Sequence, residues 1–85
     1  MKFIPITATG IAKASQTRVC NILLTSGSDA ASLILRDGST GSDTIFATVK
    51  APTGTSVPVT LGSVDVTAIH ATLSGTNAVA YIYYN

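Results

Sequence analysis

Few side chains in this sequence could carry out acid–base or nucleophilic chemistry. The 85 residues include one histidine, His70, one cysteine, Cys20, four aspartates and no glutamate. His70 could act as a general base, but no nucleophile lies at a recognisable spacing from it. A small hydrolase using His70 with Asp65 would lose an activity, but not assembly, on His70→Ala. No motif supports that hypothesis, so we predict that the chain is not an enzyme and that His70 is a structural or interface residue.

The aspartates are typical of turns rather than of a metal site. Three of them, Asp29, Asp37 and Asp43, lie in or beside turns, where the carboxylate accepts hydrogen bonds from nearby backbone N–H groups. The segment DGSTGSD at 37–43 superficially resembles a calcium loop. It lacks the alternating ligands and the final glutamate of an EF-hand, and no glycine-rich phosphate motif occurs elsewhere. We predict no metal and no other cofactor.

The single cysteine excludes an internal disulfide. Cys20 lies on the apolar side of its segment, where a small core residue is more typical than a nucleophile. A domain of this size buries a small core, and such domains commonly rely on a disulfide, a metal or a partner chain for stability. Oligomerisation is therefore the expected source of added stability.

Short apolar segments separated by Gly, Ser, Asn, Asp and Pro predict strands and no helix, because a 3.6-residue apolar period never persists for three turns. The spacing of about 8 to 12 residues is typical of a sandwich or barrel. We predict one all-β domain over residues 1–85, a small antiparallel β-sandwich or jelly-roll-like fold. The predicted strands are Arg18–Thr25, Ala31–Arg36, Thr44–Lys50, Ser56–Leu61, Thr67–Leu73 and Ala78–Tyr84.

Residues 1–16 have two interpretations. Phe3, Ile4 and Ile6 favour burial, whereas Pro5 cannot donate a hydrogen bond to a sheet. The segment is either an N-terminal arm that docks on a neighbouring molecule or the first edge strand. Pro58 likewise predicts an edge position for its own strand.

Two reversals are predicted to be β-hairpins. The first joins the strands on either side of residues 37–43, and the second joins Thr67–Leu73 to Ala78–Tyr84 through Ser74–Asn77. Gly75 and Asn77 are residues that tolerate positive φ.

The last strand is apolar on both sides, with Tyr81 and Tyr83 on one side and Ile82 and Tyr84 on the other. Such a strand must be covered on both sides, by a second sheet and by something else, for which another copy of the chain is a candidate. In the strand Thr44–Lys50, alternation places Phe46 on the outward, polar side, which makes it a candidate contact residue.

The composition favours contact with protein over nucleic acid or membrane. Only 11% of residues are charged, against about 25% in a typical domain, and the net charge is +1. No basic run and no long apolar run is present, so we expect neither a nucleic-acid nor a membrane partner. The N-terminus lacks the apolar core of a signal peptide. A surface of Thr, Ser, Ala and Gly suits close approach of another protein, although it is also ordinary for a β domain.

Residues 31–59 and 64–84 resemble a group of short tailed-phage virion proteins. The resemblance lies in L-x-L-x-D-G at Leu33–Gly38, the lysine-ended strand Ile45–Lys50, and A-x-L-x-G-T at Ala71–Thr76 before a strand rich in Val and Tyr. It extends from about Val19 to the end of the chain. The family is that of capsid decoration, or cement, proteins: small β-sandwiches that commonly trimerise and bind over the joints between capsid subunits.

The resemblance implies a homotrimer that binds the major capsid protein on the phage head, after synthesis in the host cytoplasm. The alternative is a small tail- or fibre-associated binding module that recognises a host glycan or receptor. The candidate interface residues are Phe46, His70, Tyr81, Ile82, Tyr83 and Tyr84, with Phe3, Ile4 and Ile6 as candidate arm residues.

Overall fold

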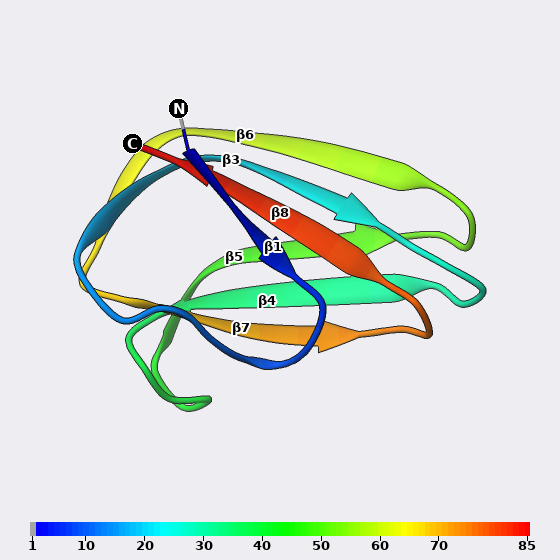
Figure 1. The fold of residues 1–85 in the computed structure, drawn as a ribbon, viewed down its shortest axis with the longest axis horizontal. Helices are drawn as coiled ribbons and strands as arrows, with labels where there is room; N and C mark the ends of the chain where they lie inside the picture. Colours follow the sequence, from blue (N-terminus) through cyan, green and yellow to red (C-terminus); the bar gives the residue numbers. More distant parts are fainter. Residues whose placement is uncertain (1) are drawn as a thin grey trace.

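The computed structural model describes residues 2–85, which form eight strands and contain no helix that is long and apolar enough to cross a membrane (Figure 1). The strands are β1 (Lys2–Ile6), β2 (Gly10–Lys13), β3 (Thr17–Thr25), β4 (Ala31–Asp37), β5 (Thr44–Ala51), β6 (Ser56–Val66), β7 (Ile69–Ser74) and β8 (Val79–Tyr84). The prediction of an all-β chain is confirmed.

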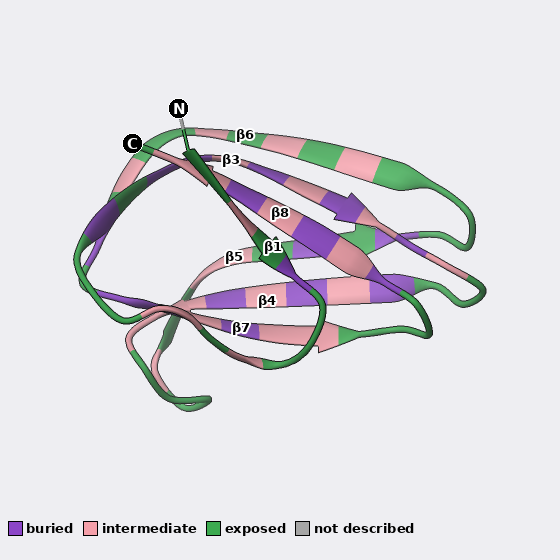
Figure 2. Cartoon of the chain, in the orientation of Figure 1, coloured by how far each residue is buried: buried purple, intermediate pink, exposed green. Residues whose placement is uncertain are grey.

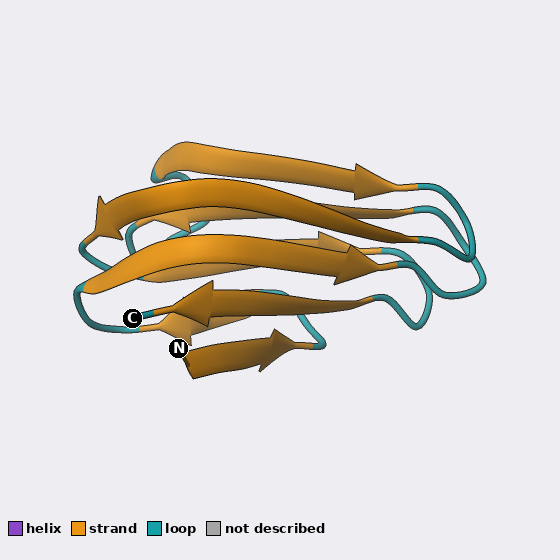
Figure 3. Ribbon diagram, turned by 90° about the horizontal axis from the view of Figure 1, so that it is seen from above, coloured by secondary structure: helices purple, strands orange, loops and turns teal. Residues whose placement is uncertain are grey.

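The strands form two antiparallel sheets of four, in the orders β1-β8-β3-β6 and β2-β7-β4-β5. Figure 3 shows one layer of strands lying over the other. The first strand pairs with the last, the second with the seventh, the third with the sixth and the fourth with the fifth. The chain is therefore a long hairpin that is wound over on itself, which is how a jelly roll is built. Only β4 and β5 are consecutive strands of one sheet; every other connection crosses to the opposite sheet.

The core lies between the two sheets. Buried and partly exposed residues alternate along β4 and β8, as the two-residue period of a strand requires (Figure 2). The largest side chains that are fully buried come from both sheets: Val19, Ile22, Leu24 and Ile82 from one, and Leu33, Leu35 and Ile69 from the other.

The proline predictions are confirmed, since β1 and β6, which carry Pro5 and Pro58, are the two edge strands of their sheet. Of the two interpretations of the N-terminal segment, the structure agrees with the edge strand, because β1 pairs with β8 of the same chain. Ile6 is buried and Ile4 packs against the core, whereas Phe3 is exposed. Met1, the first residue of the predicted arm, lies outside the described residues.

The hairpin predicted around residues 37–43 is confirmed, but the one predicted around residues 74–77 is wrong. β7 pairs with β2 and β4, whereas β8 pairs with β1 and β3, so this reversal joins the two sheets. Its turn chemistry is as predicted, because Gly75 and Asn77 both have positive φ. Turn residues indicate where the chain reverses, not which strand each arm then pairs with.

Two β-bulges interrupt the alternation of side-chain directions, and the first of them overturns a prediction. In β5, a bulge opposite Leu35 and Arg36 changes the alternation, so that Ile45 is 49% exposed and Phe46 packs against the core. The prediction of an outward Phe46 is therefore wrong. In β3, a second bulge between Val19 and Asn21 leaves both Val19 and Cys20 buried. An extra residue on one strand reverses the facing of every residue beyond it.

Candidate binding face

The outer surface of the β1-β8-β3-β6 sheet carries a continuous set of apolar and aromatic side chains, which we call the aromatic face. The strand register lines them up in rows: Phe3, Tyr83, Asn21 and Thr60 form one row, and Pro5, Tyr81, Leu23 and Pro58 the next. A third row consists of Val79, Thr25 and Ser56. None of these residues carries a charge.

Phe3 stands at the β1 edge of this face. Its ring lies against two tyrosines of β8, with centroid distances of 5.8 Å to Tyr81 in an edge-on arrangement and 6.1 Å to Tyr83. These are favourable aromatic geometries, so the ring is held from one side. Phe3 nevertheless remains 57% exposed, the largest exposed fraction among the large apolar side chains of the described residues.

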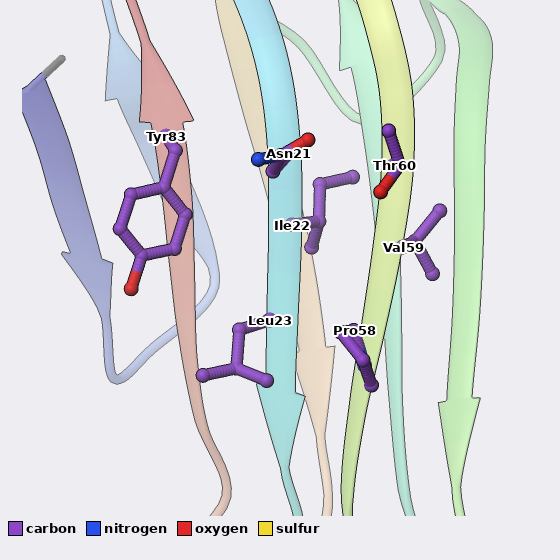
Figure 4. A pocket seen from close by; sticks show the side chains of 7 residues that line it. All are labelled: Asn21, Ile22, Leu23, Pro58, Val59, Thr60 and Tyr83. Atoms are coloured by element: carbon purple, nitrogen blue, oxygen red, sulfur yellow. The ribbon is translucent and has the colours of Figure 1, made fainter.

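A groove lies toward the opposite edge of the same face (Figure 4). It has a volume of about 340 Å³ and runs over β3 between β8 and β6. Tyr83, Leu23 and Pro58 supply its apolar parts, while the amide of Asn21 and the hydroxyl of Thr60 are the polar groups within it. The groove can accept an apolar ring and donate or accept a small number of hydrogen bonds.

The outer surface of the β2-β7-β4-β5 sheet is different in chemistry. His70 of β7 pairs with Ile11 of β2 on one side and with Arg36 of β4 on the other. His70 Nδ1 and Arg36 Nε are both buried without a hydrogen-bond partner. The loop at Gly41 covers the imidazole, since a Cβ there would lie 3.8 Å from His70 Cε1.

Each aspartate has a structural partner. Asp65 accepts a hydrogen bond from Arg18 at 2.8 Å, Asp29 accepts from the Thr76 hydroxyl, and Asp37 Oδ1 accepts from the Thr67 N–H at 2.8 Å. The structure therefore pairs Asp65 with an arginine rather than with the histidine that the hydrolase hypothesis needs. Within residues 2–85, no group of three His, Cys, Asp or Glu side chains could hold a metal ion.

Asp43 caps its own loop, and this gives a pH-dependent prediction. Its pKa lies below the ordinary value, chiefly because the backbone N–H of Thr40 donates to Oδ2 at 2.9 Å and also because the Thr40 hydroxyl does so. A depressed carboxyl pKa contributes stability that is present above the unfolded-state value of about 4 and lost as pH falls through the folded-state value. In urea unfolding, the stability difference between the wild type and Asp43→Asn should therefore shrink from pH 6 to pH 2.5. A difference that is unchanged at pH 2.5 would contradict this role.

The candidate residues named from the sequence lie in four environments. Tyr81 and Tyr83 share the outer side of β8 and lie on the aromatic face, whereas Ile82 is fully buried and its prediction as an interface residue is wrong. Tyr84 lies at the end of β8, with the Lys13 ammonium 4.9 Å from its ring centroid. His70 is on the opposite sheet.

The sequence prediction missed Leu23, Pro58 and the groove between them. These residues come together because β8, β3 and β6 lie side by side, although β8 and β3 are far apart in the chain. Alternation within β3 and within β6 is enough to place Leu23 and Pro58 on the outer side of their strands. Only the strand order shows that both residues share a surface with Tyr83.

Comparison with known proteins supplies no relative: no protein-family model, no curated protein and no solved structure matches the chain.

Proposed function

We propose that this chain is a structural protein of a tailed-phage virion, a capsid decoration or cement protein that binds the assembled head as a homotrimer and stabilises it. The observation that carries the proposal is the aromatic face, a broad uncharged surface on a rigid two-sheet frame. Contiguous exposed apolar surface of this kind marks a site of protein contact. The residues that resemble decoration proteins supply the assignment to a phage head.

The fold suits this task because the residues that make the frame rigid are not the residues that form the contact surface. The core residues between the sheets hold the frame, while the outward residues of β1, β8, β3 and β6 are left for partners. A ligand that binds the assembled shell but not its dissociated subunits stabilises the shell by mass action. Three linked copies bind more tightly than one, since the second and third contacts are intramolecular.

The test is addition of the purified protein to heads that lack it, assembled from the major capsid protein of the phage that encodes the chain. We expect saturable binding and a rise in the temperature at which the heads open. Matched variants are Tyr81→Lys on the aromatic face and Thr48→Lys on the outer side of β5. Binding lost only in the first variant supports the proposal, and heads that bind no wild-type protein would refute it.

The groove favours a second candidate function, a tail- or fibre-associated module that binds a host glycan. A tyrosine ring beside an amide and a hydroxyl can stack on a sugar and bond its hydroxyl groups. Labelling virions with an antibody against the chain separates the two functions. Decoration predicts label over the whole head in many copies, whereas a tail module predicts a few copies at one vertex or tip.

A further inference from the structure

We propose that Phe3 of one copy inserts into the groove between Tyr83, Leu23 and Pro58 of a neighbouring copy. This inference rests on the proposed homotrimer and identifies the contact that holds it together. It names a projecting residue and a receiving site that are both present on every chain.

Phe3 has the properties of the projecting residue. It is more than half exposed, and its two tyrosine neighbours fix its ring from one side only. A ring that is already held loses little conformational freedom on binding, which reduces the entropic cost of association. Aromatic anchors that enter a pocket commonly dominate the energy of an interface.

The groove has the properties of the receiving site. Its volume of about 340 Å³ is at the small end of the range for ligand pockets, where one ring is a suitable occupant. An aromatic ring placed between Tyr83 and Pro58 would be covered on both sides by apolar atoms. The hydroxyl of Thr60, an exposed residue, would lie beside the entering ring.

The positions of the two elements suit contact between copies. Phe3 is on the β1 edge of the sheet, and the groove lies over β3 and β6, near the other edge. With strands about 4.8 Å apart, the two are separated by roughly 12 Å across the face. Because the projecting residue and the groove occupy different places on the same chain, two arrangements satisfy the contact: a two-fold pair in which each Phe3 enters the other copy's groove, and a head-to-tail series of copies. The proposed homotrimer requires the second arrangement, which forms a closed ring when the rotation between copies permits.

Charge favours a second copy over an unrelated charged partner as the occupant. The rows that contain Phe3 and the groove have no charged residue, so two copies brought together at this face place no like charges against each other. Farther along β3 and β6, Arg18 and Asp65 are exposed, but they form an ion pair with each other at 2.8 Å. The opposite sheet surface bears Arg36 and Lys50. A charged partner would find no complementary group on the aromatic face.

The experiment measures self-association by light scattering and sedimentation in the absence of heads. Phe3→Asp should raise the dissociation constant at least about 30-fold, the loss typical of an interface hot spot. Ile11→Asp is the matched control, because Ile11 is also an edge-strand residue and is 56% exposed, but lies on the other sheet. Thr60→Lys should weaken association as Phe3→Asp does, and combining the two changes in one chain should restore part of it through a new ion pair between copies.

A second measurement does not depend on the stability of the Phe3→Asp variant. Copies carrying Phe3→Cys are mixed with copies carrying Thr60→Cys, both with Cys20→Ala, and are oxidised. A disulfide between the two kinds of chain, absent when Ile11→Cys replaces Phe3→Cys, supports the contact because the bond forms only when the Cα atoms approach within about 7 Å.

Three outcomes would overturn the inference. Self-association that survives Phe3→Asp, or that is lost equally in Ile11→Asp, removes Phe3 from the contact. Loss of glycan binding in Thr60→Lys with self-association unchanged assigns the groove to a sugar. A wild-type chain that is monomeric yet binds heads overturns the contact between copies and leaves the decoration function standing. Conversely, a trimer that binds no heads leaves the contact standing and refutes the decoration function.

Discussion

Replacing Ile82 with alanine is expected to lower the free energy of unfolding by about 2–5 kcal/mol. Ile82 is fully buried in the middle of β8, where it pairs with Ile4 of β1 and Ile22 of β3. Truncation removes buried methyl and methylene groups and leaves a cavity that neighbours on two strands can fill only in part. The measurement is urea unfolding followed by circular dichroism.

The matched control on the same strand is Val79→Ala. Val79 has the opposite facing, on the outer side of the sheet, and is only partly buried. Its truncation should cost less than about 1 kcal/mol, since a surface site relaxes into solvent. Equal losses in the two variants would contradict the assignment of Ile82 to the core and Val79 to the outer face.

Gly75→Ala is expected to destabilise the protein by about 1–3 kcal/mol or more, because the change is unfavourable in two ways. Gly75 has a φ of 114°, a value that L side chains rarely adopt. A Cβ at this position would also lie 2.8 Å from the carbonyl oxygen of Ala30 and 3.0 Å from Ala31 Cα, which are backbone atoms that cannot easily move. Thermal and urea unfolding measure the loss.

Gly54→Ala separates the two causes. Gly54 also has a positive φ, of 72°, but a Cβ there has no atom within 4 Å. Its substitution should incur the conformational cost alone and be milder than Gly75→Ala. If Gly54→Ala were the more damaging change, close packing at the connection between β7 and β8 would not be the reason that residue 75 is a glycine.

Local pattern predicted strands at the positions of β3 to β8, because alternation is a local property, but did not predict β2. In the predicted strand Ala31–Arg36, Leu33 and Leu35 alternate with Ile34, and both leucines are fully buried in β4. Pro5 and Pro58 were correctly placed on edges, since a missing N–H is incompatible with a central strand.

The bulges and the strand pairings could not be predicted in the same way. Phe46 was assigned to the wrong side because strict alternation was carried across an extra residue that no local signal marks. The last two strands were assigned to one hairpin because their turn has hairpin chemistry, yet they pair in different sheets. Pairing depends on which distant strand buries each apolar face, and that is a property of the whole fold.

The candidate site likewise combines residues that local alternation identified and residues that only the strand pairing brings together. Tyr81 and Tyr83 were found from the two-sided apolar character of their own strand. Phe3 was noted only as part of an N-terminal arm, and Leu23 and Pro58 were not connected with it. These residues share one surface through the register between β1, β8, β3 and β6, which the sequence does not reveal.

The most direct test of the account is the solution mass of the purified chain, by light scattering after gel filtration. A homotrimer held through the aromatic face predicts three times the chain mass of 8.6 kDa, with dissociation on Phe3→Asp and not on Ile11→Asp. A mass of 8.6 kDa at every concentration would contradict the homotrimer and, with it, the contact between Phe3 and the groove.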